Sequence, residues 1–151
     1  MAKHIKNLNE LQMALMPTIE QMANLVIEDV YKKLNYFLAD YYKWEPKSYR
    51  RTRDFLYSAV KVEAEPYNGG VRAAVYIDYK KMNHYASVSG YQVAKWANEG
   101  THGGWSVSHK PHVWENTMKY TVEDGSLLRL AAQYLRSQGI HVVDYLTADE
   151  K

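Results

Sequence analysis

Residues 9–42 have the sequence NELQMALMPTIEQMANLVIEDVYKKLNYFLADYY, and this stretch decides the fold. Apolar side chains recur every three or four positions, which places them in one stripe along a single helix. At ~1.5 Å per residue, the part that follows Pro17 is already about 40 Å long. That is longer than a small domain is wide, so we expect part of the helix to pack outside its own domain. The stripe consists of Leu11, Leu15, Ile19, Met22, Val26, Val30, Leu34, Phe37 and Tyr41.

Two prolines should shape this helix. Pro17 lies inside the pattern, where a proline removes a backbone donor and clashes with the preceding turn, so we expect a kink or the true helix start there. Pro46 favours an extended conformation at Glu45, so the helix should end before it. Residues 1–16 are then an N-terminal extension, flexible or kinked.

A β-hairpin is predicted next. Residues 60–65 alternate between apolar and charged side chains, which is typical of a strand with one wet face. Residues 66–70 are dense in turn formers, and residues 71–77 are a second β-rich run, so the two runs should pair antiparallel. The apolar face should pack on the helix stripe. The residues expected on that buried face include Val60, Val62, Val71, Ala73, Val75 and Ile77.

The C-terminal half predicts two more helices. Residues 91–99 have helical spacing and Gly100 as a stop, and residues 112–137 carry a second helical pattern that is broken near Gly125. The segment between them, residues 101–110, has no period and should form a loop.

The expected fold class is α+β. We expect a long N-terminal helix packed on a small antiparallel sheet, with a short helix and a C-terminal helix. A chain of 151 residues fits one domain, residues 1–151. Residues 140–151 are expected to be a C-terminal tail, although residues 140–146 also suit a short strand.

The composition is that of a soluble globular protein, with 46% hydrophobic and 24% charged residues. There are no cysteines, which excludes disulfides, thiol nucleophiles and cysteine zinc sites. No membrane span or signal peptide is expected. The unusual feature is 14 tyrosines against 2 phenylalanines, together with 4 tryptophans. Tyrosine and tryptophan suit surfaces that are wet alone and buried in a complex, although an aromatic core would also use them.

The candidate chemistry is sparse, so we expect neither an enzyme nor a cofactor. His102, His109 and His112 share one segment, but their spacing matches no metal motif, and surface or interface histidines are the favoured interpretation. Glu99, Thr101 and His102 are close in sequence, which does not by itself place them for relay chemistry. The two Gly-Gly pairs lack the setting of a phosphate loop.

The segment Lys43–Arg53 carries a basic face interleaved with aromatic residues. Guanidinium groups and aromatic rings together suit phosphates and stacked bases, so DNA binding is one hypothesis. A solvated surface, or the partner of an acidic neighbour, is the more common role of such a loop. The basic residues are Lys43, Lys47, Arg50, Arg51 and Arg53.

Two short stretches carry a family resemblance. Residues 46–60 (PKSYRRTRDFLYSAV) and 96–104 (WANEGTHGG) resemble segments of the small tail-component, or tail-completion, proteins of long-tailed bacteriophages. The predicted order of elements also agrees over about residues 8–138. The family's Phe-Leu-x-Pro-Ala entry to the last helix is replaced here by residues 111–114 (PHVW), which leaves the position within the neck open.

The resemblance implies a structural virion protein, made in the host cytoplasm, that forms a ring at the neck where head meets tail. Its expected partners are copies of itself and the neighbouring head-completion and tail-tube or tail-terminator proteins, with packaged DNA as a further contact and no membrane. The alternative is a small DNA-binding protein that uses the basic face. The subunit-interface candidates are Trp105, His102, His109 and Tyr49.

Overall fold

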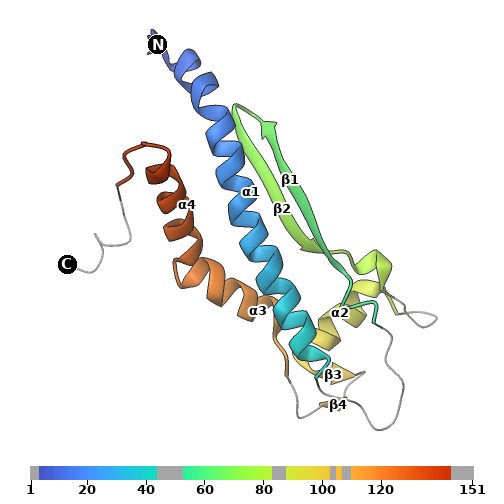
Figure 1. Ribbon diagram of the computed structural model, residues 1–151. Helices are drawn as coiled ribbons and strands as arrows, with labels where there is room; N and C mark the ends of the chain where they lie inside the picture. The colour runs from blue at the N-terminus through green and yellow to red at the C-terminus, as the bar shows by residue number, and fades with distance from the viewer. Residues whose placement is uncertain (1–3, 44–52, 83–87, 103–104, 107–109, 144–151) are drawn as a thin grey trace.

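The computed structural model describes residues 4–43, 53–82, 88–102, 105–106 and 110–143 (Figure 1). It confirms the α+β class, with a long helix, a two-stranded antiparallel hairpin and several shorter helices. In chain order the elements are α1 (Leu8–Tyr41), β1 (Ala59–Tyr67), β2 (Gly70–Ile77), η1 (Tyr79–Lys81), α2 (Gly90–Glu99), β3 (Thr101–His102), β4 (Trp105–Ser106), α3 (Val113–Met118), η2 (Lys119–Glu123) and α4 (Ser126–Ser137).

Helix α1 runs through Pro17, so of the two outcomes expected there, a kink or a helix start, the helix start is wrong. The helix begins nine residues earlier because Asn7 caps it: the Asn7 side chain accepts a hydrogen bond from the Glu10 backbone N–H at 2.9 Å. The Glu10 carboxylate in turn accepts from the Lys6 backbone N–H at 2.9 Å. The first bond satisfies a donor that a helix start leaves unpaired, and the second holds the residue before the cap, so that together they fix the true N-terminus.

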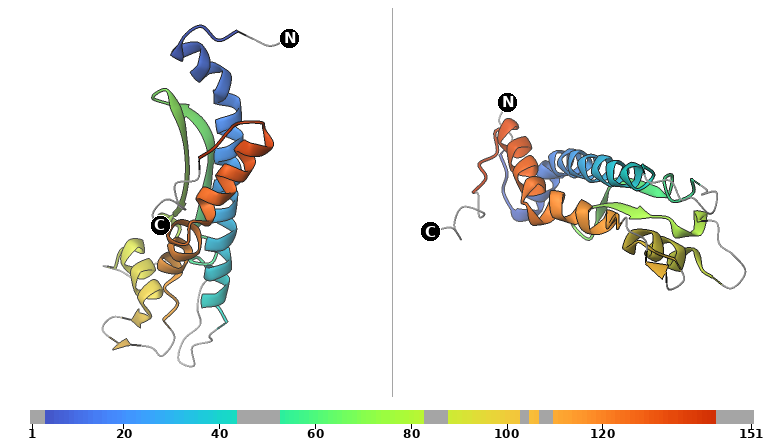
Figure 2. Two further views of the ribbon diagram at one scale, coloured as in Figure 1. Left: turned by 90° about the vertical axis from the view of Figure 1, so that its left-hand side faces the viewer. Right: turned by 90° about the horizontal axis from the view of Figure 1, so that it is seen from below.

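Helix α1 lies at the centre of the molecule, with the hairpin on one side and α3, η2 and α4 on the other (Figures 1 and 2). The main core gathers at the C-terminal end of α1, where Leu34 is 0% exposed. Tyr41 meets Phe55 edge to face, with ring centroids 5.4 Å apart. The buried members of this core are Leu34, Leu38, Tyr41, Phe55, Met82, Ala97 and Val113.

The hairpin pairs as predicted but buries the other face of β1. Opposed residues in an antiparallel pair share a face. Val75 and Ile77 pack against the core, and their partners Lys61 and Ala59 therefore face α1 as well. Val60 and Val62, opposite Tyr76 and Ala74, point away from α1, which contradicts the expected buried face for these two valines.

Lys61 takes the inward position because α1 offers it partners. Its ammonium hydrogen-bonds the Glu28 carboxylate and lies 5.6 Å from the centre of the Tyr31 ring. The register then shifts by one residue between Val62 and Glu65, a β-bulge in β1. The Asn24 side chain of α1 accepts from the Ala64 backbone N–H at 2.6 Å within this bulge. Polar contacts thus fasten β1 to α1 where a purely apolar face was expected.

The hairpin turn and the short helix are as the sequence indicates. Asn68 and Gly69 have φ of 47° and 76°, the left-handed pair that a tight two-residue hairpin turn requires. Helix α2 starts at a Ser89 cap and ends at Gly100, whose φ is 69°. A Cβ added at Gly90 would lie 1.9 Å from the Tyr79 carbonyl oxygen, so glycine is required where α2 meets η1.

The C-terminal half differs from the prediction in one detail. The segment 101–110, expected to be a loop, contains the short strands β3 and β4, which pair antiparallel. The predicted break near Gly125 is confirmed: η2 is a π-helix that continues α3, and Gly125, with φ of 73°, leads into α4. In residues 140–143 the structure has no strand.

Candidate subunit interface

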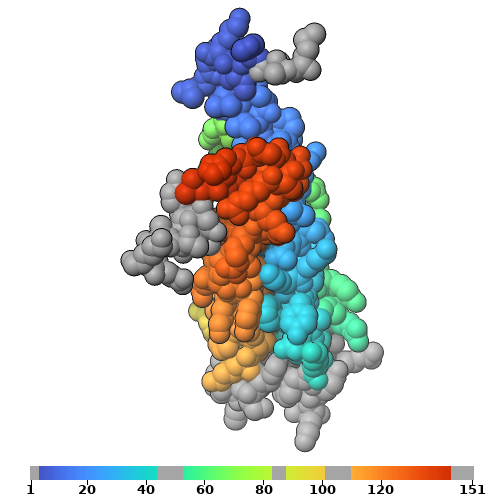
Figure 3. Space-filling model, turned by 60° about the vertical axis from the view of Figure 1, so that its left-hand side comes forward, coloured from blue at the N-terminus to red at the C-terminus, as the bar shows by residue number. Residues whose placement is uncertain are grey.

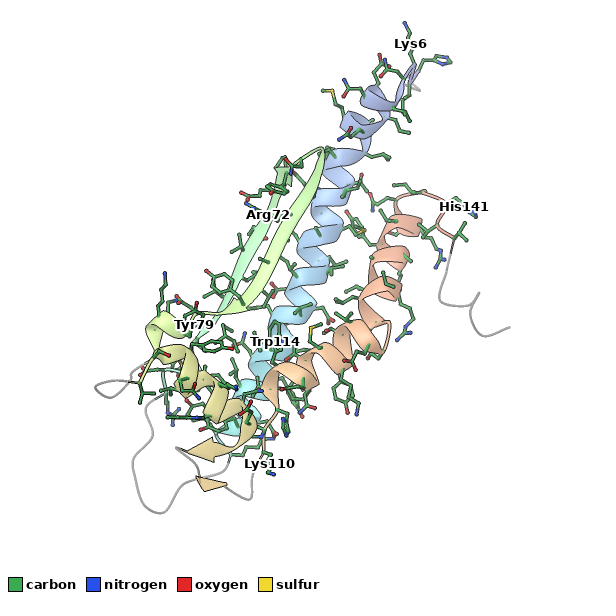
Figure 4. All side chains as sticks on the ribbon, turned by 180° about the vertical axis from the view of Figure 1, so that it is seen from behind. Lys6, Arg72, Tyr79, Lys110, Trp114 and His141 are labelled. Carbon is green, nitrogen blue, oxygen red and sulfur yellow. The ribbon has the colours of Figure 1, made fainter. Side chains whose placement is uncertain are left out.

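The first candidate surface is the N-terminal part of α1, residues 8–19, hereafter the arm. It extends along and past the tip of the hairpin, and Lys6 marks its free end (Figure 4). Leu8 is 82% and Met13 69% exposed, and α1 has no buried residue before Ile27. The Gln12 side chain donates to the Gly69 carbonyl and ties the arm to the hairpin turn. Between them lies an open groove of ≈ 340 Å³, lined by Leu8, Leu11, Gln12, Leu15, Met16, Ile19, Gly69 and Gly70.

The second surface is the outer hairpin face, the side of the hairpin that points away from α1. Val62 and Tyr76 are 40% and 45% exposed there. Towards the turn, Glu65 and Arg72 form an ion pair at 2.5 Å, and the Arg72 guanidinium lies 4.3 Å from the Tyr67 ring centre. The face is therefore apolar in the middle and polar at the end nearest the turn, and interface patches commonly combine an apolar centre with a polar edge. Its members are Val60, Val62, Glu65, Tyr67, Arg72, Ala74 and Tyr76.

The third surface is an aromatic patch where α1 meets η2. Phe37 stacks on Tyr120 with ring centroids 5.8 Å apart, and Tyr36 meets Phe37 edge to face at 5.2 Å. Tyr36 and Tyr120 are 63% and 47% exposed. Two lysines complete the patch: Lys43 lies 5.9 Å from the Tyr36 ring centre and Lys119 5.5 Å from that of Tyr120. Figure 3 shows the face on which α1 and the α3–η2 segment meet.

The lysines near these surfaces differ in whether they form ion pairs with a carboxylate. The Asp40 carboxylate bonds Lys43 at 2.9 Å and raises the pKa of that ammonium group. Next to the hairpin, the Lys61 hydrogen bond lowers the pKa of the Glu28 carboxyl, and the pKa of Lys61 is raised by the same bond and by Glu63. Lys61 thus forms ion pairs with two carboxylates, those of Glu28 and Glu63. Lys119, in contrast, forms no ion pair with any residue that the structure describes.

The structure places few of the site residues predicted from sequence. Lys47, Tyr49, Arg50, Arg51 and His109 lie outside the described residues. For His102 and Trp105 only the backbone is described, and it pairs the two residues across β3 and β4.

Two members of the predicted basic face are described, and both are exposed. These are Lys43, already paired with Asp40, and Arg53. The aromatic patch was missed because its tyrosines lie far apart in sequence, and the tyrosine surplus was its only sequence signal.

The comparisons with known proteins add the family. The chain matches the protein family described as YomN over residues 7–137. The chain belongs to the YomN family. YomN is a phage-related family, so the coarser part of the resemblance, a phage-associated protein, holds. No curated protein and no solved structure matches this YomN-family chain.

Two further findings concern membrane spanning and metal binding. None of the described helices of this YomN-family chain is both long and apolar enough to cross a membrane. Across the described residues, no three His, Cys, Asp or Glu side chains come together in an arrangement that could hold a metal ion.

Proposed function

We propose that this YomN-family protein is a non-catalytic structural subunit of a tailed-phage particle, a tail-completion or head-tail connector protein that joins copies of itself into a ring at the neck. In this proposal it is made in the host cytoplasm and becomes part of the virion. Its other partners there are the head-completion protein and the tail-tube or tail-terminator protein next to it.

The observation that carries the proposal is the placement of exposed apolar and aromatic side chains. Soluble monomers rarely expose large contiguous apolar patches, and patches with a polar rim are typical of interaction sites. Here the outer hairpin face and the aromatic patch belong to elements on different sides of α1 (Figure 1). A closed ring needs two different surfaces on each subunit, so this placement supports a ring rather than an isologous dimer.

The test uses the purified full chain and purified particles. We expect its mass, measured by native mass spectrometry and by sedimentation over a range of concentrations, to rise from one subunit to a single closed multiple. Labelled antibodies should locate the protein at the neck in electron micrographs. A chain that stays monomeric at the highest concentration and is absent from particles would refute the proposal.

We do not extend the proposal to DNA binding. In the described part of the basic face Lys43 bonds Asp40, and Lys47, Arg50 and Arg51 lie outside the described residues, so no described contact supports DNA binding. Filter binding at two salt concentrations tests this alternative, because a contact made to phosphates weakens steeply as salt rises. Strong binding of DNA that weakens as the salt concentration rises would support the DNA-binding alternative.

A further inference from the structure

The backbone of α1 is weakened at Pro17. Proline has no N–H, so the Met13 carbonyl lacks the hydrogen bond that residue 17 of a regular helix would donate to it. The proline ring also crowds this carbonyl, and for these two reasons helices commonly bend at proline. In the left view of Figure 2 the N-terminal end of α1 leans away from the line of the rest of the helix. The helix therefore resists bending least within the arm, at Pro17.

The contacts of α1 with other elements also change at Pro17. After it, the Gln21 side chain accepts a hydrogen bond from a tyrosine hydroxyl of α4 at 2.6 Å. The Asn24 side chain accepts from β1, which lies on the other side of α1. Before the proline, one hydrogen bond joins the helix to another element among the residues that the structure describes, from the Gln12 side chain to the Gly69 carbonyl. The helix is thus fastened on both sides after Pro17 and held by a single polar contact before it.

The contact between Gln12 and Gly69 depends on a glycine in the hairpin turn. A Cβ added at Gly69 would lie 2.6 Å from the Gln12 side-chain nitrogen, so a larger residue would displace the glutamine. The bond is exposed. Water competes with an exposed hydrogen bond, so its net strength is small and it can open without disturbing the core.

The position of the arm decides how much apolar surface this end of the molecule offers. Leu15 and Met16 are half-buried and line the groove beside the hairpin turn, whereas Leu8 and Met13 are largely exposed already. An arm that moves away from the turn widens the groove and uncovers Leu15 and Met16. The single bond to Gly69 therefore controls access to these side chains.

We propose that Pro17 is a hinge and that the bond from Gln12 to Gly69 is a latch. Residues 8–16 move about Pro17 as a rigid helix, between a closed position with the bond made and an open position with the bond broken. The inference goes beyond the proposed function, because it concerns the free subunit and holds whether or not the chain forms a ring.

Distances between two spin labels test the hinge in the full chain. The chain has no cysteine, so two introduced cysteines are the only labelling sites. Asn9→Cys places one label on the exposed arm, and Val62→Cys places the other on the outer hairpin face. Asn9 lies eight residues before Pro17, ~12 Å along the helix axis, so bending by ~20° moves its label by about 4 Å. Pulsed electron paramagnetic resonance measures the distribution of distances between the labels.

Three variants of the doubly labelled chain separate the latch from the hinge. Gln12→Ala removes the latch, and the distribution of distances should broaden by about 4 Å or more. Adding Pro17→Ala to Gln12→Ala restores the missing backbone donor, so the distribution should return close to that of the parent chain. Gln21→Ala is the matched control, because the same change beyond the hinge breaks a bond to α4 and none of the arm. It should leave the distribution unchanged.

Hydrogen exchange distinguishes a swing of the arm from its unfolding. A rigid arm keeps its internal backbone bonds when it opens. The amides of residues 11–16 should therefore exchange at the same rate in Gln12→Ala as in Gln21→Ala.

The other outcomes would each overturn the proposal. If Gln12→Ala gives the same distances as Gln21→Ala, the bond to Gly69 is not a latch. If Pro17→Ala does not narrow the distribution of Gln12→Ala, the hinge is not at Pro17. Faster exchange throughout residues 11–16 in Gln12→Ala would show that the arm unfolds instead of swinging. None of these results bears on the ring, whose test is the mass of the assembled chain.

Discussion

The two halves of α1 share one amphipathic pattern but have different surroundings. From Ile27 to Tyr41 the helix contributes to a core shared with the hairpin, α2 and α3, and Leu34 and Leu38 are completely buried. The arm has leucines and methionines at equivalent spacing, yet Leu8 and Met13 remain largely exposed. The comparison shows that apolar periodicity predicts a helix but not what will cover it. In this chain the fold covers the C-terminal part of the helix, while Leu8 and Met13 of the arm are left exposed.

Matched leucine replacements give the largest expected effect. Leu34→Ala removes a fully buried side chain and should lower the free energy of unfolding by about 2 to 5 kcal/mol. Leu11→Ala, the same change in the arm, should cost less than about 0.5 kcal/mol in the free subunit. Urea unfolding measures the free energy of unfolding of both variants. An equal loss at the two positions would mean that the arm is covered in the free subunit.

A smaller effect is expected at the bulge. The Asn24 side chain accepts from the Ala64 backbone N–H, and Asn24→Ala would leave that donor in the hairpin without its partner. Removing such a bond should cost about 1 kcal/mol. Thermal unfolding measures the loss, and Asn35→Ala is the control, since among the described residues Asn35 donates only to the Tyr31 carbonyl one turn earlier in α1. If the two variants were equally stable, Asn24 would not fasten the hairpin.

The helix cap should have a local effect only. Asn7→Ala removes the bond to the Glu10 N–H, and such a cap is worth roughly 0.5 to 2 kcal/mol to the turn it closes. Because the first turns of the arm carry no core contacts, we expect faster hydrogen exchange in the arm with almost no change in global stability. A clear drop in the midpoint of global unfolding would show that the arm belongs to the cooperative core.

The smallest effect concerns the ion pair between Glu28 and Lys61. The Lys61 hydrogen bond lowers the pKa of Glu28, so the pair stabilises the fold above the ordinary carboxyl pKa and loses this contribution as the pH falls through the lowered value. Glu28→Gln should therefore be slightly less stable than wild type at neutral pH and equal to it in acid. Unfolding measured at several pH values tests this, and a gap that widened in acid would contradict the sign.

Much of the fold could be predicted from the sequence, because its signals are local. The 34-residue helix follows from apolar spacing, the hairpin turn from Asn68–Gly69, and the end of α2 from Gly100. The buried face of β1 could not be predicted. Both faces of the hairpin carry apolar residues. Which face is buried depends on Lys61, which contacts Glu28 and Tyr31 of α1, and these residues are far from Lys61 in the sequence.

The candidate surfaces were less predictable than the fold. Tyr36 and Tyr120 come together only because η2 packs on α1, and no spacing rule connects them. The tyrosine surplus was compatible with a surface for a partner and with an aromatic core. The position of such a surface could be found only from the structure, in which η2 packs on α1.

The β-bulge between Val62 and Glu65 has a consequence for symmetry. An extra residue in one strand increases the local twist of a hairpin, and here it leaves Glu65 still opposite Arg72. Deleting Ala64 would therefore flatten the ribbon without changing which residues face outward. If the proposed ring is joined through that ribbon, the twist contributes to the rotation between successive subunits. The deletion variant should then close with a different number of copies, so a single residue in β1 would act on the rotational order of the whole assembly.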